Sequence, residues 1–197
     1  MSTHRYIHLD VFTDRRFSGN QLAVFPRAGE ISGEVMQQIA AEINYSETTF
    51  VLPAEAEGTD CRMRIFTPGA ELPMAGHPTI GTTFALAGEE TIRPGTTGFV
   101  FGLGVGPTAV RLEWTGDRLS FAWMRQPLPE FGASVGDPAP LAAALGVEAA
   151  EIAATGLVPQ IVSSGVPLLF AALASREAVD RATLDRAGVR AVFEALG

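Results

Sequence analysis

The sequence contains no lysine, a single cysteine and no long apolar run, and each of these absences excludes a class of protein. Arginine supplies all 14 basic residues apart from three histidines, and the formal net charge is −8. There is therefore no cationic stripe for the phosphates of a nucleic acid. The sequence has no run of about 18 apolar residues, which is the length that a helix needs to cross a bilayer. We expect neither a nucleic-acid partner nor a membrane partner.

The one cysteine, Cys61, cannot form an internal disulfide and has no CxxC partner for zinc. It lies between Asp60 and Arg62 in a segment with a strand pattern, which favours a small buried hydrophobe over a metal ligand or nucleophile. We predict no metal site. Residues 1–10 lead directly into a strand pattern without the apolar stretch and cleavage site of a signal peptide, so a cytoplasmic location is expected.

The 197 residues, 47% of them hydrophobic, suffice for one sizeable core or two small lobes. Ser32 is a candidate N-cap, and apolar residues recur at helical spacing behind it, so residues 33–43 are predicted to form an amphipathic helix. A second helix is predicted over residues 78–87, with Gly88 as its C-cap. Alternating or β-branched patterns predict strands at residues 6–12, 22–25, 48–52, 62–66, 98–101 and 109–114.

The remaining pattern is weaker. Residues 127–140 are rich in proline and glycine and are predicted to connect two lobes. A helix is expected over 141–145, two strands around a Ser-Gly turn over 160–170, and helices over 182–187 and 189–196 separated by Gly188. The glycines of 102–106 superficially match a dinucleotide fingerprint, but Pro107 follows and no amphipathic helix does. A loop or bulge is the prediction there.

Glu47 is the first candidate functional residue. It lies between Ser46 and Thr48 at the start of a strand, and side-chain alternation puts it on the same side as Thr49 and Val51. A carboxylate drawn into a partly apolar cleft is harder to ionise, which makes it a usable acid or base near neutral pH. The alternative is a solvated glutamate at a strand entrance.

The second candidate site is the start of the predicted helix at Gly76-His77-Pro78-Thr79-Ile80. Gly76 permits close approach of a ligand, and Pro78 presets the first helical dihedral. The free amides of Thr79 and Ile80 are then expected to face a carboxylate or phosphate. His77 could donate to a substrate or shuttle a proton. A histidine that only caps the helix is the alternative.

The order of these segments resembles the PhzF (phenazine biosynthesis-like) family. The resemblance covers residues 6–87 and rests on Asp10-Val11-Phe12-Thr13, Phe17-Ser18-Gly19-Asn20, Ser46-Glu47-Thr48-Thr49-Phe50-Val51-Leu52, Arg64-Ile65-Phe66-Thr67-Pro68 and Glu71-Leu72-Pro73-Met74-Ala75-Gly76-His77-Pro78-Thr79. Looser similarity continues through Met124-Arg125-Gln126-Pro127 and Pro129-Glu130-Phe131-Gly132 to Ser163-Ser164-Gly165-Val166-Pro167.

The resemblance implies an α+β fold with the diaminopimelate-epimerase-like architecture. That architecture has two lobes, each of mixed or antiparallel β-structure around a buried central helix, with the site between them. Residues 1–126 would form the N-terminal epimerase-like lobe, with 78–87 as its central helix. Residues 127–197 would form a linker and an incomplete second lobe.

The resemblance also implies a chemistry. In the family the Ser-Glu-Thr glutamate acts as general acid and base, which maps onto Glu47, and the Gly-His pair maps onto Gly76 and His77. The implied reaction is a cofactor-free isomerisation of a small carboxylate-bearing metabolite, such as a dihydro-hydroxyanthranilate. Glu47 and His77 would be the catalytic residues, and Gly76 and Thr79 would bind the carboxylate. Asn20 and Ser46 are further candidate substrate-binding residues.

One departure concerns the C-terminal side. Members of the family continue past a point comparable to Gly197 into an Asp-Pro-Ala-Thr-Gly-Ser-like segment that opposes the glutamate, and none occurs here. The gap could be covered by a complementary C-terminal chain or by a homo-oligomer, dimers being usual in the family, or the chain could be a half-protein without turnover. The function is then a PhzF-like isomerase or, alternatively, a non-catalytic small-molecule-binding or assembly module. Thiol-based epimerisation is disfavoured because it needs a cysteine on each lobe.

Overall fold

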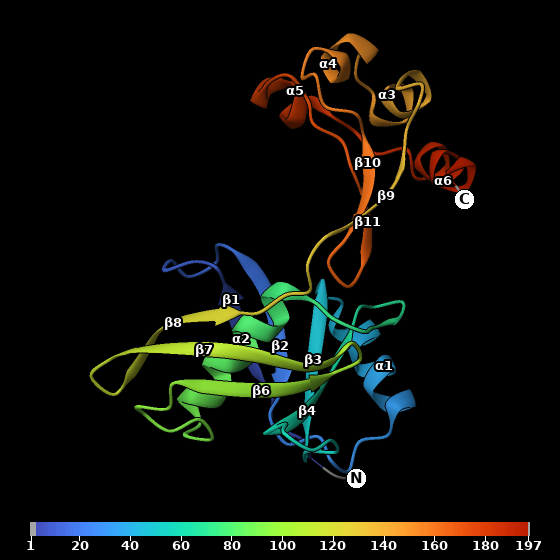
Figure 1. Cartoon of the computed structure of the whole chain (residues 1–197). Helices are drawn as coiled ribbons and strands as arrows, with labels where there is room; N and C mark the ends of the chain where they lie inside the picture. The colour runs from blue at the N-terminus through green and yellow to red at the C-terminus, as the bar shows by residue number, and fades with distance from the viewer. Residues whose placement is uncertain (1–2, 197) are drawn as a thin grey trace. The chain divides into compact units, whose positions relative to one another are not determined.

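The computed structural model describes residues 3–196, and the chain divides after Gln126 into two compact units (Figure 1). Each unit mixes helices and strands, so the fold class is α+β, as predicted. The first unit contains strands β1 (Ile7–Val11), β2 (Asn20–Phe25), β3 (Glu47–Leu52), β4 (Cys61–Phe66), β5 (Glu71–Leu72), β6 (Gly98–Leu103), β7 (Gly106–Thr115) and β8 (Arg118–Met124) and helices α1 (Gly33–Ile43) and α2 (Gly76–Gly88).

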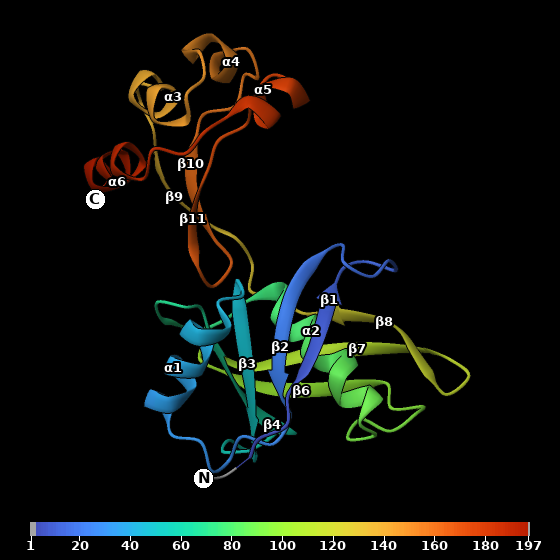
Figure 2. The same cartoon turned by 180° about the vertical axis from the view of Figure 1, so that it is seen from behind.

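The strands of the first unit form one curled sheet in the order β1-β2-β3-β4-β6-β7-β8, with β5 paired to β4. The β2–β3 and β4–β6 pairs are parallel and the other pairs are antiparallel. Helix α2 contacts β1, β2, β3 and β8, and the two opposite views show it enclosed by the sheet (Figures 1 and 2). It is the central helix of this unit.

Side-chain alternation along the strands builds two cores in the first unit. On the inner face Val51 and its neighbours pack against α2, while on the outer face Phe50 packs with Phe25 and Phe66 beneath α1. Helix α2 is buried although it is rich in threonine, because the hydroxyls are satisfied locally. Thr82 shares a 2.8 Å hydrogen bond with Thr49 of β3. Buried hydroxyl groups require such partners, because a buried polar group without a hydrogen bond destabilises the fold.

The boundaries of α1 agree with the sequence prediction, and those of α2 differ slightly. In α1 the Ser32 hydroxyl accepts from the amide of Val35, as an N-cap should. Helix α2 starts at Gly76, before the predicted first residue, and contains Gly88, the predicted C-cap. The C-cap is Glu89, and the left-handed residue that reverses the chain is Glu90, at φ 57°.

The second unit contains the antiparallel strands β9 (Glu130–Ser134), β10 (Gln160–Ser163) and β11 (Pro167–Phe170) in the order β11-β10-β9. Its helices are α3 (Ala139–Leu145), α4 (Ala149–Ala153), α5 (Arg176–Arg181) and α6 (Arg186–Ala195). The core contains Leu141, Ile152 and Val192. The predicted helix over 141–145 and the predicted strand pair over 160–170 are confirmed. The apolar side chains of Phe131, Leu168 and Phe170 remain more than half exposed.

Two predictions for the second unit were wrong. The segment 127–140 is more than a connection, because it contains β9, which pairs with β10. The helix predicted over 182–187 is absent, and α6 instead runs without a break through Gly188. Here the glycine serves close packing, since a Cβ at position 188 would lie 2.8 Å from the Cβ of Ala144 on α3. Asp185 caps the start of α6 by accepting from Ala187.

The predictions for the glycine-rich segment and for Cys61 are confirmed. The glycine-rich segment is a hairpin, in which Leu103 of β6 pairs with Gly106 of β7. Cys61 is buried in β4, and burial raises the pKa of its thiol to about 12, with Asp60 contributing further. This agrees with a structural cysteine. Among residues 3–196, no helix is long and apolar enough to cross a membrane.

Candidate active site

Strand β3 and helix α2 bring Glu47 and His77 together. Glu47 is the first residue of β3 and His77 the second of α2. His77 Nε2 lies 3.4 Å from Glu47 Oε2, and the two side chains are only 9% and 17% exposed. The separation is that of an ion pair, but neither atom makes a hydrogen bond with good geometry to any of residues 3–196. Two buried polar atoms are thus left with unused hydrogen-bonding capacity, which is uncommon in folded proteins. Among residues 3–196, Thr48 Oγ1 and Arg62 Nε share this property, but the Glu47–His77 pair is the place where two such atoms face each other.

Asn20 and Ser46 extend this pair toward the surface. The Ser46 hydroxyl lies 2.9 Å from Asn20 Oδ1, and Asn20 Nδ2 lies 3.1 Å from His77 Nδ1. Asn20 begins β2 and Ser46 immediately precedes β3. Because β2 and β3 pair in parallel, their starts meet at the same edge of the sheet. Four of the six residues selected from the sequence are therefore joined in one row.

The ring of His77 is kept neutral by its surroundings. Burial lowers the pKa of His77, and the Glu47 carboxylate and the backbone of Gln21 raise it by less than burial lowers it. The ring is therefore uncharged at neutral pH. A neutral imidazole has one donor nitrogen and one acceptor nitrogen, so the two sides of this ring differ in what they can do.

The start of α2 supplies free backbone amides beside this pair. Ala75 is the N-cap, and its side chain caps nothing. The amides left without a helical partner are those of Ala75, Gly76 and His77, since Pro78 has none. The sequence prediction had placed them at Thr79 and Ile80, which lie too far into the helix. Thr79 is fully buried and its hydroxyl donates to the carbonyl of Ala75, so its side chain holds the helix start together instead of facing a ligand.

Gln126 lies next to the candidate site, although no pattern in the sequence points to it. A Cβ added to Gly76 would lie 3.5 Å from Gln126 Nε2, so this carboxamide is next to the start of α2. Gln126 follows the end of β8, fifty positions along the chain from Gly76. No spacing rule connects two such positions. Only the looser family resemblance around Met124-Arg125-Gln126-Pro127 could have drawn attention to it.

Other parts of the molecule offer weaker candidates. Among residues 3–196, no group of three or more histidine, cysteine, aspartate or glutamate side chains could hold a metal ion. Hollows of about 440 and 420 Å³ lie on the C-terminal unit, lined by residues of α6 and, for the second, by Val135 and Pro140. Neither contains a residue selected from the sequence.

The comparison with known proteins decides the family. Residues 9–195 match the phenazine biosynthesis-like protein family, PhzC-PhzF. The chain belongs to this family. An uncharacterized isomerase of Mesorhizobium japonicum is 39% identical over 186 residues, which are 94% of this chain and 61% of that protein. The trans-2,3-dihydro-3-hydroxyanthranilate isomerase of Pseudomonas aeruginosa is 41% identical over 153 residues, which are 74% of this chain and 50% of that protein.

Solved structures give the same family and extend the fold. A PhzF-family phenazine biosynthesis protein of Bacillus anthracis superposes with a TM-score of 0.84 at 28% identity, covering 99% of this chain and 64% of that one. A probable proline racemase of Agrobacterium radiobacter, at 12% identity and a TM-score of 0.59, shares the fold alone. The expected α+β fold of the diaminopimelate-epimerase-like type, with a curled sheet, is thus confirmed, and the site between two lobes stays an expectation. The PhzF-family chain described here spans about half to two thirds of the length of these relatives.

Proposed function

We propose that this chain carries the proton-transfer site of a cofactor-independent PhzF-like isomerase that acts on a small metabolite bearing a carboxylate. The observation that carries the proposal is the buried pair of Glu47 and His77, 3.4 Å apart and with unused hydrogen-bonding atoms, beside the uncapped start of α2. Family members named as isomerases support the reaction class.

In this proposal each group has one task. The Glu47 carboxylate takes a proton from a carbon next to an activating group and returns it to another carbon of the same substrate, so the enzyme ends unchanged. The free amides of Gly76 and His77, at the positive end of α2, bind the substrate carboxylate. The neutral His77 ring hydrogen-bonds and orients the substrate. Gln126 lies where its carboxamide can add a contact to the same carboxylate.

The test replaces Glu47 by glutamine, which keeps the shape but removes the basic oxygen. Solvent deuterium incorporation into trans-2,3-dihydro-3-hydroxyanthranilate, followed by NMR in D₂O, is expected to fall at least about 100-fold. Calorimetric binding of the same compound should change little. The control is Glu42→Gln on the exposed surface of α1, which should leave exchange unchanged. Undiminished exchange in Glu47→Gln would remove this residue from the mechanism.

A second candidate is a non-catalytic module that binds the small molecule or assembles with a partner. It is favoured by one observation: among residues 3–196, the neutral His77 is the titratable group paired with Glu47, and no second carboxylate pairs with either. If the wild-type chain binds the carboxylate compound but exchanges no deuterium, this candidate replaces the first. Light scattering on the purified chain, alone and with a co-expressed complementary chain, tests the proposed homo-oligomer or complementary partner.

A further inference from the structure

The carboxamide of Asn20 lies between the Ser46 hydroxyl and the His77 ring, and its orientation decides where the ring proton is. In one arrangement Ser46 donates to Asn20 Oδ1, and Asn20 Nδ2 donates to His77 Nδ1 at 3.1 Å. In the reverse arrangement the amide is flipped, the serine oxygen accepts, and His77 Nδ1 carries the proton. A serine hydroxyl can donate or accept, so both arrangements satisfy these three side chains.

Glu47 distinguishes the two arrangements because it faces the other ring nitrogen. In the first, His77 Nε2 carries the proton, on the side of the ring where Glu47 Oε2 lies 3.4 Å away. In the second, a nitrogen lone pair would face a carboxylate oxygen across the same gap, in a site where both side chains are largely buried. Like electron pairs repel more strongly where water is scarce. The first arrangement is therefore the stable one.

We propose that Asn20, anchored by Ser46, is a positioning residue that keeps the neutral His77 ring protonated at Nε2, so that an N–H faces Glu47. This assigns Asn20 and Ser46 a task different from the substrate binding expected from the sequence. The tautomer does not depend on the reaction, whereas its importance for catalysis rests on the proposed function. In the reaction, the N–H would be available to the Glu47 carboxylate or to a substrate oxygen that enters between them.

The groups around the ring are few. Strand β3 contributes the charged Glu47, and β2 contributes the Asn20 carboxamide and the backbone of Gln21. Strands β1 and β8 also pack against α2, but no titratable group on them contributes to the lowered pKa of His77. Asn20, the neighbour that sets the ring tautomer, can therefore be replaced while the charged contact with Glu47 is kept.

The direct test is NMR of the chain with ¹⁵N-labelled histidine at a pH where the ring is neutral. The chain has three histidines, and the variants His4→Gln and His8→Gln identify the signals that belong to His77. We expect Nε2 to be protonated and Nδ1 to be the unprotonated, acceptor nitrogen. A wild-type ring protonated at Nδ1 would overturn the proposal, and this measurement needs no substrate.

The variant test replaces Asn20 by aspartate, which can only accept. The proton is expected to move to Nδ1, and the pKa of His77 is expected to rise by about 1 or more, since a second carboxylate then faces the ring. The matched control is Gln21→Glu, which adds the same charge one residue along β2 on the opposite side of the strand. It should leave the tautomer as in the wild type. An unchanged tautomer in Asn20→Asp, or the same change in Gln21→Glu, contradicts the proposal.

A final readout links the tautomer to turnover. Asn20→Asp should lower the deuterium exchange rate and displace its pH profile toward higher pH, following the raised pKa of His77. If the tautomer changes in the variant while exchange is unaffected, Asn20 still positions the ring but the ring is not needed for the reaction. If the wild-type chain exchanges no deuterium but shows the expected tautomer, the proposed function fails and the role of Asn20 stands.

Discussion

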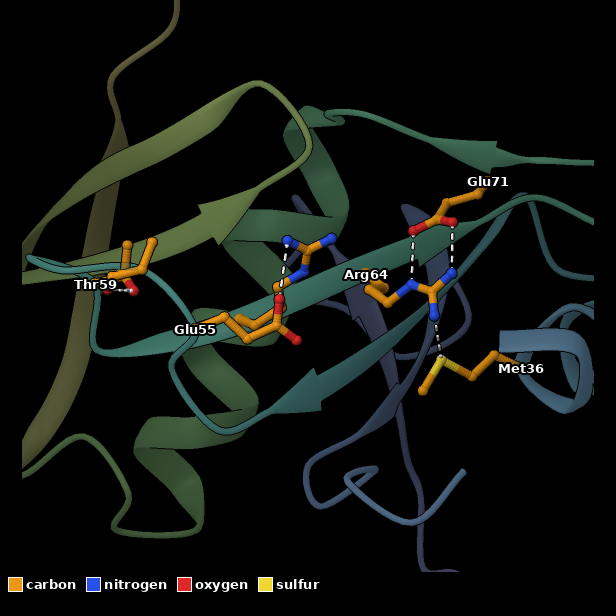
Figure 3. A network of polar contacts seen from close by, with 7 residues as sticks. Met36, Glu55, Thr59, Arg64 and Glu71 are labelled. Carbon is orange, nitrogen blue, oxygen red and sulfur yellow. Dashed lines mark hydrogen bonds and ion pairs between the residues drawn. The ribbon is translucent and has the colours of Figure 1, made fainter. Parts of the chain in front are cut away.

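At the scale of single residues, Arg64 of β4 shows how one side chain connects its own strand with β5 and α1. Its guanidinium binds both oxygens of Glu71 on β5, at 2.8 and 2.6 Å (Figure 3). The same group lies 3.8 Å from the sulfur of Met36 on α1 and stacks 5.0 Å from the ring centre of Phe66. Bidentate geometry makes this pair stronger than an ordinary surface ion pair. It fixes β5, from which the chain continues to the start of α2.

Replacing Glu71 by glutamine should make the free energy of unfolding less dependent on pH in the acidic range. The hydrogen bond from Arg64 lowers the pKa of Glu71, and a carboxyl with a lowered folded-state pKa stabilises the fold above its ordinary pKa of 4.5. That contribution is lost as the pH falls through the lowered value. Because the side chains of Arg64 and Glu71 are 25% and 39% exposed, we expect Glu71→Gln to lower the free energy of unfolding by only about 0.5–1 kcal/mol at pH 7.

Urea unfolding at neutral and acidic pH measures this effect. The difference between the wild type and Glu71→Gln should shrink as the pH falls below 4.5. The control is Glu55→Gln, which removes a more exposed partner, 3.3 Å from Arg62 and 59% exposed, without bidentate geometry. Glu55→Gln should lower the free energy of unfolding by less than Glu71→Gln does at neutral pH, and by no more at acidic pH. Equal losses for the two variants, independent of pH, would contradict the stabilising role of the Arg64 pair.

At the scale of elements, helix α2 depends on one glycine for its approach to the sheet. A Cβ added to Gly81 would lie 2.5 Å from Leu22 Cδ2 and 2.7 Å from Val11 Cγ2, in the core between α2 and strands β1 and β2. Gly88, in the same helix, has nothing within 4 Å of its added Cβ. Close packing therefore requires a glycine at position 81 but not at position 88.

Alanine at these two positions should have effects of opposite sign. Gly81→Ala overpacks the core and should lower the free energy of unfolding by about 1–3 kcal/mol. Gly88→Ala meets no neighbour and should raise it by about 0.5–1 kcal/mol, because alanine favours the helix more than glycine does. Urea denaturation of the two variants tests both values. Similar stability for the two variants would show that α2 can move away from the sheet without cost.

How far the sequence predicts this fold depends on whether a feature is local. Helix α1 was predicted with correct bounds because its cap and its apolar spacing lie within a dozen residues. Strand β9 was missed because all its residues are exposed and no buried alternation marks it. The sequence predicts a break at Gly188, yet α6 continues through it and the glycine allows close packing against Ala144 on another helix. Tertiary packing overrode the local preference of glycine there.

The candidate site follows the same rule. Glu47 and His77 were selected because each lies in a distinctive local segment, and their closeness is a property of β3 and α2 packing together. The free amides were placed too late because the sequence does not show that α2 begins before Pro78. Gln126 was missed because its neighbour Gly76 is fifty residues away. Contacts of this range require the folded chain.

At the scale of the whole molecule, each apolar core lies within one of the two units into which the chain divides after Gln126. The two clusters of the first unit draw on residues between Ile7 and Met124, and the cluster of the second draws on residues between Val135 and Leu196. Among residues 3–196, none of these clusters combines side chains of both units. A unit that contains its own core can in principle fold alone. The candidate residues Asn20, Ser46, Glu47, Gly76 and His77 all belong to the first unit.

A fragment of residues 1–126 should therefore fold on its own with the candidate site intact. We expect a single cooperative urea transition, and ¹⁵N-histidine spectra in which His77 has the same tautomer as in the full chain. The matched control is a fragment of residues 1–115, which lacks β8 and with it the core residues Leu119 and Ala122. It should show no cooperative transition, because the face of α2 that packs against β8 is then open to water. If residues 1–126 also remain unfolded, the second unit contributes stability that the separate cores do not explain.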